Sequence, residues 1–273
     1  MIIQSFIDSV KNKYGKDLSV YSASFLKKAI ARRWKETASS SLEGYTGFLI
    51  GNQDEMDLLT DSLLINYTVF FRNRIDVALL EEIVFPELIR IRKNNKSFSF
   101  RIWTVGCSDG PEAFSFAMIA NDVINESGGQ IPVIVFGTDI SGAAIAKAKK
   151  STYSSQSVEN VRLSYLNRYF EIRNSEYIVN DKIRSQVDFT EGDIIDINYT
   201  SPPSAIFADF DLVSCCNLMI YYNHEIQQLI MEKLYHSLGK GGYLLVDASE
   251  RLIVEKYGKF RLLLPVGNIY IRN

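Results

Sequence analysis

Strands and helices alternate along the chain from residue 98 onward, and this alternation limits the possible fold more than any other feature of the sequence. The apolar runs SFRIWTVGC, VIVFGTDI, FDLVSCC and GGYLLVDAS each have the length of a buried strand. Between them lie helical patterns such as SGAAIAKAKK and HEIQQLIMEKLYHSLG. Strands that alternate with helices in this way predict an α/β fold, a doubly wound and mostly parallel sheet with helices on both faces.

The first part of the chain has a different pattern. Apolar residues recur at helical spacing in FIDSVKNKY, FLKKAIARRW and EMDLLTDSLLI, so residues 1–75 predict an all-helical N-terminal domain. Residues 76–273 predict the sheet domain, which opens with another helix over 76–95. Short alternating runs on either side of RNSE predict a small β insertion at about 154–190.

Composition and charge exclude several classes of protein. The chain has 273 residues and a formal net charge of −2, which gives no reason to expect a nucleic-acid partner. Its apolar runs are shorter than the roughly 18–20 residues of a membrane span, and its first residues do not resemble a signal peptide. These features favour a cytoplasmic protein that is not itself a membrane protein.

The cysteines raise the question of a metal or thiol site. An odd count of three, Cys107, Cys215 and Cys216, does not resemble a disulfide framework. Adjacent residues on a strand point to opposite faces, so Cys215 and Cys216 are poorly placed to bind one metal. The two histidines, His224 and His236, lie in or beside the following helix. We therefore predict no metal site, with Cys215 as a core residue and Cys216 nearer the strand end, where it could line a pocket.

Ligands of a doubly wound sheet bind at the carboxyl ends of its strands, so the residues that follow each strand are the candidates. Gly106 and Gly110 follow the first strand and would allow close backbone approach, although an ordinary strand–helix turn would also use them. Glu112 lies in the next helix's first turn, where it would suit either the helix dipole or a cationic ligand group. Asp139 follows the second strand, where it could bind ribose hydroxyls or cap the next helix. Asp193 follows the third strand, and either an adenine contact or an ordinary turn would explain it.

These loops are more informative together than singly. The glycine loop is neither the G-x-G-x-x-G pattern nor a phosphate-binding loop, because no G-K-[ST] sequence follows it. A glycine loop followed by two strand-end acids describes a nucleoside site without a phosphate clamp. That combination fits S-adenosylmethionine better than NAD or ATP.

Four segments resemble one family in order and spacing. INYTVFFRN (65–73), RIWTVGCSDGPEAFSFAM (101–118), VFGTDISGAAIAKAKKSTY (135–153) and FDLVSCCNLMIYY (210–222) are similar to segments of the CheR-type chemotaxis receptor methyltransferases. The resemblance extends over nearly the whole chain. It implies a Rossmann-like methyltransferase that transfers a methyl group from S-adenosylmethionine to receptor glutamates, releasing S-adenosylhomocysteine.

The resemblance also implies roles for individual residues. Arg72 and Tyr221 correspond to the family's active-site arginine and to the tyrosine that faces the substrate glutamate. From the residues alone, Arg72 would be a cation at a helix end. The positions implied to bind the cofactor are Asn66, Thr68, Arg72, Gly106, Gly110, Glu112, Asp139, Asp193, Ile194, Cys216 and Asn217.

The chain departs from the family pattern at the site itself. Pro111, Ala113 and Phe114 replace a glutamate, a proline and a tyrosine of the family's loop, and Cys216 replaces an arginine. A cysteine cannot pair bidentately with a carboxylate as an arginine does. If no other cation such as Arg72 compensates, the loss costs roughly 1.5–3 kcal/mol, or about ten- to a hundredfold in cofactor affinity.

The basic side chains of the second predicted helix are candidates for docking on acidic receptor helices. This contact with the cytoplasmic helices of the receptors would be made by Lys27, Lys28, Arg32 and Arg33, although a solvated charged face would have the same sequence pattern.

Two other functions also fit the sequence. One is a small-molecule S-adenosylmethionine-dependent methyltransferase, and the other is a relative that binds the cofactor without catalysis.

Overall fold

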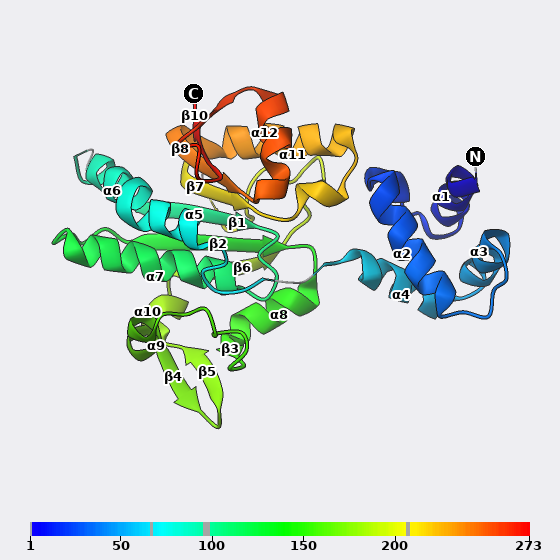
Figure 1. The fold of residues 1–273 in the computed structure, drawn as a ribbon, viewed down its shortest axis with the longest axis horizontal. Coiled ribbons are helices and arrows are strands. Elements are labelled where there is room, and N and C mark those ends of the chain that lie inside the picture. Colours follow the sequence, from blue (N-terminus) through cyan, green and yellow to red (C-terminus); the bar gives the residue numbers. More distant parts are fainter. Residues whose placement is uncertain (1, 66–67, 95–98, 206–207) are drawn as a thin grey trace. The chain divides into compact units, whose positions relative to one another are not determined.

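The structure is a computed structural model that describes residues 2–65, 68–94, 99–205 and 208–273 (Figure 1). The chain divides into two compact units. The helical unit contains Met1–Ile65 and Leu218–Gln228, and the sheet unit contains Asn66–Asn217 and Leu229–Asn273. Residues 68–75 therefore group with the sheet, although the sequence predicts them as part of the helical domain.

The sheet unit is built on a central sheet with the strand order β6-β2-β1-β7-β8-β10-β9 among the described residues. Its strands are β1 (Phe100–Val105), β2 (Val133–Asp139), β6 (Val187–Glu191), β7 (Phe210–Cys215), β8 (Leu238–Val246), β9 (Phe260–Leu262) and β10 (Ile269–Arg272). The first five strands in spatial order are parallel, and β10 runs antiparallel to both of its neighbours. The predicted α/β fold with a doubly wound, mostly parallel sheet is confirmed.

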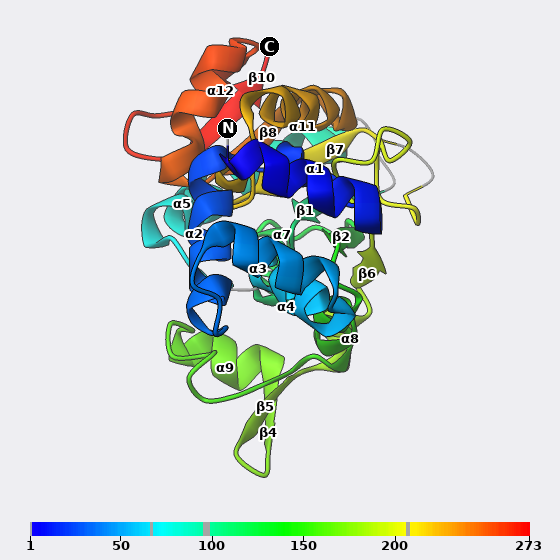
Figure 2. The same ribbon diagram turned by 90° about the vertical axis from the view of Figure 1, so that its right-hand side faces the viewer.

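Helices cover both faces of this sheet. Figure 1 shows α6 (Phe85–Asn94) and α7 (Pro111–Glu126) on one side and α11 (His224–Ser237) and α12 (Arg251–Tyr257) on the other, and Figure 2 shows α8 (Gly142–Lys150) on the side opposite to α11. Alternate strand residues such as Ile102, Val135 and Leu212 join one buried cluster with residues of α6, α7 and α8. Trp103, at an intervening position of β1, packs against Phe210 of β7 with a distance of 5.6 Å between ring centroids, and β7 has a register shift between Phe210 and Leu212. This two-sided burial explains why the strands read as continuous apolar runs.

The helices of the sheet unit alternate with its strands as predicted. They are α5 (Arg74–Leu79), the π-helical turn η2 (Leu80–Val84), α6 (Phe85–Asn94), α7 (Pro111–Glu126), α8 (Gly142–Lys150), the end of α11 (His224–Ser237), the short turn η4 (Ala248–Glu250) and α12 (Arg251–Tyr257). The sequence predicts one uninterrupted helix over 76–95, whereas the structure places a π-helical turn inside it. It does not predict α12 or β9, because neither shows a clear apolar period.

The predicted β insertion is present as a second sheet with the order β3-β5-β4. It contains β3 (Thr152–Tyr153), β4 (Phe170–Arg173) and β5 (Glu176–Val179), together with the helices α9 (Leu163–Tyr169) and α10 (Asp181–Arg184). Asn174 and Ser175 form the turn between β4 and β5 with positive φ angles of 50° and 65°. This is where RNSE indicates a turn.

The helical unit is made of four N-terminal helices and a short segment from later in the chain. The helices are α1 (Ile2–Tyr14), α2 (Ala23–Lys35), α3 (Leu42–Ile50) and α4 (Gln53–Leu63), with the turns η1 (Leu18–Val20) and η3 (Met219–Tyr221). Side chains of Ser22, Ser41 and Asn52 cap three of the helices. Residues such as Val10, Leu26 and Leu59 form a separate core. No described helix is long and apolar enough to cross a membrane.

Candidate active site

The glycine loop after β1 adopts the backbone that its sequence allows. Gly106 and Gly110 have φ angles of 69° and 95°, in the left-handed region that favours glycine. A Cβ atom built on Gly110 would lie 2.7 Å from Cζ of Phe189, so a side chain there would also clash. Gly110 is the N-cap of α7, and Pro111 is in its first turn. The turn at the carboxyl end of β1 therefore requires glycine at both positions.

Asp139 stands at the end of β2 and ties two loops together. Its Oδ2 accepts a 2.8 Å hydrogen bond from the backbone N–H of Ser108, and its Oδ1 accepts a 2.9 Å bond from that of Ser141. Burial raises the pKa of the Asp139 carboxyl, and these two amides oppose that rise. The cap of α8 is Ser141, not Asp139, so the alternative prediction of a helix cap is wrong. Each carboxylate oxygen keeps a second lone pair for a ligand hydroxyl.

Asp193 and Ile194 lie in the loop after β6. Oδ1 of Asp193 accepts a 3.0 Å hydrogen bond from the backbone N–H of Ile195, and burial raises the pKa of this carboxyl. The carbonyl of the buried Ile194 accepts a 2.7 Å bond from Nζ of Lys233 on α11. The loop is therefore held to the helix behind it, with a partly buried acid at its start.

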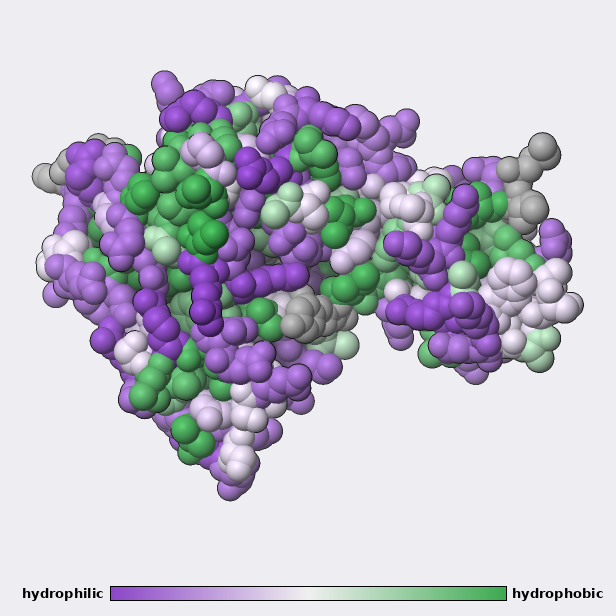
Figure 3. Space-filling view, in the orientation of Figure 1, coloured by the Kyte–Doolittle hydropathy of each residue, from purple (hydrophilic) through white to green (hydrophobic). Residues whose placement is uncertain are grey.

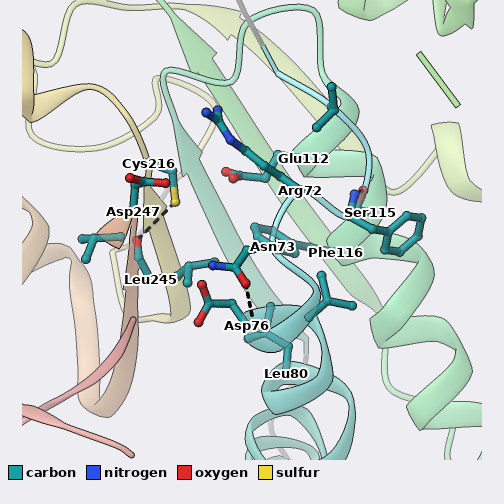
Figure 4. A pocket seen from close by; sticks show the side chains of 14 residues that line it. Arg72, Asn73, Asp76, Leu80, Glu112, Ser115, Phe116, Cys216, Leu245 and Asp247 are labelled. Atoms are coloured by element: carbon teal, nitrogen blue, oxygen red, sulfur yellow. Dashed lines mark hydrogen bonds between the residues drawn. The ribbon is translucent and has the colours of Figure 1, made fainter. Parts of the chain in front are cut away.

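A pocket opens next to the start of α7 (Figure 4). In Figure 4, Arg72 and Glu112 lie on one side of it and Cys216 and Asp247 lie on the other. Its described lining residues are Val69, Phe71, Arg72, Asn73, Asp76, Val77, Leu80, Glu112, Ser115, Phe116, Cys216, Leu245, Val246 and Asp247. Arg72 is the one cation among these described residues, which also include the acids Asp76, Glu112 and Asp247.

Glu112 is held in place by a residue of β7. Its Oε1 accepts a 2.8 Å hydrogen bond from Oγ of Ser214, a fully buried residue of β7. Oγ of Ser214 also lies 3.4 Å from Sγ of Cys216. Burial raises the pKa of Glu112, while the Ser214 hydroxyl and then the positive charge of Arg72 oppose the rise. The sequence does not predict the contribution of Ser214, because its partner is 102 positions away.

The segment before Arg72 is held in a strained conformation. Phe71 has a φ angle of 50°, which is rare for a bulky residue, and its N–H donates a 3.1 Å hydrogen bond to Oγ of Ser115. Rings of the β insertion pack on this segment, with Tyr165 4.9 Å from Phe71 and Tyr153 4.9 Å from Phe70 between centroids. These contacts fix the backbone from which the Arg72 side chain extends.

The other predicted residues of this segment are less informative. Thr68 is partly buried but is not among the residues that line the pocket. Asn66 lies outside the described residues. Its predicted cofactor contact therefore stays a prediction.

Asn217 follows Cys216 with a positive φ angle of 56°. Its backbone N–H donates a 2.9 Å hydrogen bond to Oε2 of Glu250, which also accepts one from the backbone N–H of Asp247. Its side-chain Oδ1 is buried and has no hydrogen-bond partner in the described part of the chain. A buried acceptor without a donor is uncommon and here marks a place for a ligand donor. The sequence does not predict the role of Glu250, although D-A-S-E has the capping-box pattern that the structure shows.

The three cysteines lie in surroundings that disfavour the thiolate. Burial raises the pKa of the Cys107, Cys215 and Cys216 thiols well above the usual range. All three therefore stay protonated near neutral pH, whereas the thiolate is the form that attacks or binds metal. The described residues contain no group of three histidine, cysteine or acidic side chains that could hold a metal ion.

Tyr221 belongs to the helical unit, whereas the pocket belongs to the sheet unit. Its ring lies 4.7 Å from that of Phe25 on α2. Arg72, Glu112 and Cys216 thus line one pocket of the sheet unit, and Tyr221 is a residue of the helical unit. Gly106, Gly110, Asp139 and Asp193 lie at the carboxyl ends of the neighbouring strands β1, β2 and β6, as predicted.

The described residues fit S-adenosylmethionine. Glu112 offers a buried acceptor for the ammonium of the cofactor, and the unpartnered Oδ1 of Asn217, which follows the pocket residue Cys216 in the chain, is a second acceptor. Asp139 keeps lone pairs for ribose hydroxyls. The sheet and this set of donors and acceptors define the class as an S-adenosylmethionine-dependent methyltransferase.

Comparisons with known proteins identify the family. Residues 66–264 match the S-adenosylmethionine-binding domain of CheR methyltransferases, and residues 2–64 match their all-alpha domain. The chain belongs to the CheR methyltransferase family.

Its relatives include chemotaxis protein methyltransferase 1 of Pseudomonas aeruginosa, 32% identical over 72% of this chain and 70% of the relative. Chemotaxis protein methyltransferase 2 of Vibrio cholerae is 29% identical over 84% of this chain and 77% of the relative. An uncharacterised 104.1 kDa protein of Rhodobacter capsulatus is 28% identical over 85% of this chain, and the chain spans only 24% of that protein.

Proposed function

We propose that this protein transfers the methyl group of S-adenosylmethionine to glutamate side chains of chemotaxis receptors, giving glutamate methyl esters. The observation that carries the proposal is an exposed arginine, Arg72, on the pocket that contains Glu112. A guanidinium beside the methyl donor suits a substrate that is itself a carboxylate. The names of the two relatives, both chemotaxis protein methyltransferases, support a role of the methylation in chemotaxis.

The chemistry asks little of the protein in acid–base terms. When bound, S-adenosylmethionine supplies a methyl group on a positively charged sulfur. A glutamate carboxylate is already ionised near neutral pH and needs no general base. The residues therefore act by binding and alignment, with Glu112 and Asn217 holding the cofactor and Arg72 orienting the substrate carboxylate through its planar fork. Tyr221 would position the same carboxylate with a hydrogen bond.

The first test is transfer of a labelled methyl group to receptor cytoplasmic fragments of the source organism. We expect label in glutamate residues as an ester that mild base releases, because a methyl ester hydrolyses where an amine or amide methylation product does not. Label that survives base, or label on small carboxylic acids or phenols with none on any receptor fragment, would contradict the proposed substrate.

The exposed basic side chains of α2 form the proposed docking surface for the receptor. Lys27, Lys28, Arg32 and Lys35 are exposed, and Figure 3 shows strongly hydrophilic side chains over this helix. Arg33 does not belong to this surface. It donates hydrogen bonds of 3.1 and 2.7 Å to the two carboxylate oxygens of the buried Glu55.

Glu55 also accepts a 2.9 Å hydrogen bond from the buried Tyr45 hydroxyl, so Arg33 is part of an internal network. Removing Arg33 would leave a buried carboxylate without its cation. The prediction that Arg33 docks the receptor is therefore replaced by a structural role, which the sequence could not reveal because Glu55 lies on α4.

Charge reversal on the docking surface should weaken receptor binding alone. We expect K28E/R32E to raise the KM for receptor fragments by about tenfold at low salt and to leave the Kd for S-adenosylmethionine unchanged, because long-range attraction is lost while the pocket is intact. The control is K240E/K256E, two exposed lysines of the sheet unit with the same net charge change. Equal losses in both double variants would mean that net charge, not this surface, is responsible.

The same proposal places the protein in the cytoplasm, where the receptor helices lie.

A further inference from the structure

The segment that follows β7 is bound to the start of α2. The backbone N–H of Ser22 donates a 2.8 Å hydrogen bond to the carbonyl of Tyr221, and the N–H of Asn223 donates a 2.9 Å bond to the carbonyl of Val20. The side-chain amide of Asn223 donates a further 2.7 Å bond to the carbonyl of Ser19. Two stretches some 200 positions apart thus share one short backbone ladder in the helical unit.

Aromatic rings reinforce this ladder. The Tyr21 ring stacks on that of Tyr222 with a centroid distance of 5.5 Å and an interplanar angle of 12°. The Phe25 ring lies 4.7 Å from the Tyr221 ring at a tilt of 45°, and 5.7 Å from Tyr21. Offset and tilted pairs at such distances are attractive and restrict the orientation of both rings. The Tyr221 side chain is therefore supported on one side by Phe25.

Phe25 occupies a particular place on α2. Ser22 caps this helix, which fixes the first turn that carries Phe25. Residues three and seven positions later on a helix lie on the same face, and here they are Lys28 and Arg32 of the docking surface. One stripe of α2 therefore carries the basic docking residues and, at its N-terminal end, the ring that contacts Tyr221.

We propose that Phe25 is a positioning residue for Tyr221, so that the helix that docks the receptor also orients the tyrosine that meets the substrate carboxylate. The inference rests on the role of Tyr221 in the proposed function. Phe25 acts only through the Tyr221 ring. Its loss should lower the turnover number and leave receptor docking and cofactor affinity unchanged.

A cycle of three variants tests this inference in the full-length protein. They are Phe25→Leu, which keeps apolar bulk but removes the ring, Tyr221→Phe, which keeps the ring but removes the hydroxyl, and the double variant. We expect each single variant to lower kcat for receptor methylation by about tenfold, because small misplacements of a catalytic group are costly. The double variant should be no slower than Tyr221→Phe, since Phe25 has no effect once the hydroxyl is gone.

Three further measurements separate positioning from general damage. The KM for receptor fragments and the Kd for S-adenosylmethionine should stay within about twofold in every variant, and Phe25→Trp should restore kcat because it replaces the ring. The control Phe48→Leu changes an exposed aromatic residue on α3 of the same unit and should have no effect on kcat.

The outcomes separate the inference from the proposed function. An unchanged kcat in Tyr221→Phe would remove the catalytic role of Tyr221 and this inference with it. A slow Tyr221→Phe combined with an unchanged Phe25→Leu, or with a double variant slowed by the product of the two single effects, would overturn the inference alone.

Discussion

Replacing Glu112 with glutamine is expected to weaken S-adenosylmethionine binding by about ten- to a hundredfold. The substitution keeps the size of the side chain and an oxygen that can accept the hydrogen bond from Ser214. It removes the negative charge that would face the ammonium of the cofactor. A hydrogen bond between charged groups contributes about 1.5–3 kcal/mol, and 1.4 kcal/mol corresponds to a factor of ten.

Titration calorimetry measures this change directly. The matched control is Glu126→Gln, which removes an exposed carboxylate at the other end of α7. A Kd within twofold of the wild-type value for Glu112→Gln would show that Glu112 does not contact the ammonium.

The binding of the cofactor should also depend on pH through Glu112. Because burial raises the pKa of this carboxyl, it takes up a proton at a higher pH than an ordinary glutamate. The neutral acid cannot pair with an ammonium. Affinity should therefore be full above this pKa and fall as the pH is lowered through it, and Glu112→Gln should remove this part of the pH dependence. Burial also raises the pKa of Asp139, so the residual slope in the variant would report the ribose side of the site.

Replacing Arg72 with alanine is expected to lower the turnover number for receptor methylation by about a hundredfold, since an unaligned carboxylate loses most of its proximity advantage. Lysine at this position keeps the charge but lacks the planar fork, so Arg72→Lys should recover only part of the rate. Arg74→Ala is the control, because Arg74 is exposed and lies only two residues away. Equal rates for Arg72→Ala and Arg74→Ala would contradict the assigned role.

Arg72 should contribute to cofactor binding as well. Cys216 stands where the family resemblance implies an arginine, and Arg72 is the one cation among the described pocket residues. We therefore expect a higher Kd for S-adenosylmethionine in Arg72→Ala in addition to the slower turnover at saturation. Cofactor affinity that is unchanged in this variant would mean that the loss of the arginine at position 216 is not compensated by Arg72.

The architecture of the sheet unit is readable from the sequence because buried parallel strands are apolar on both faces. Helix α3 was harder to predict, since Gly44 and Gly47 lower its helical propensity and its stability comes from packing. The two-residue strand β3 is too short to leave a pattern. Such elements depend on tertiary contacts that no local window contains.

The site divides in the same way. Glu112, Asp139 and Asp193 follow from the rule that ligands bind at strand ends, so their positions are predictable. The residues that hold them are not. Ser214 supports Glu112 from another strand, and Glu250 holds the backbone of Asn217 from a turn 33 positions later. Their types are common, and only the folded chain shows what they contact.

Substitution of Asp139 would remove more of the hydrogen bonds that hold the fold together than substitution of Cys216. Both oxygens of Asp139 already accept backbone amides from two separate loops, so any substitution there removes structure as well as ligand contacts. The sulfur of Cys216 lies 3.4 Å from Oγ of Ser214 and 4.0 Å from the carbonyl of Leu245, and its thiol also interacts with the Glu112 carboxyl. Positions 139 and 216 therefore tolerate substitution to different degrees. Position 139 cannot vary without the loss of hydrogen bonds that join its two loops, whereas position 216 can change its chemistry while the scaffold persists.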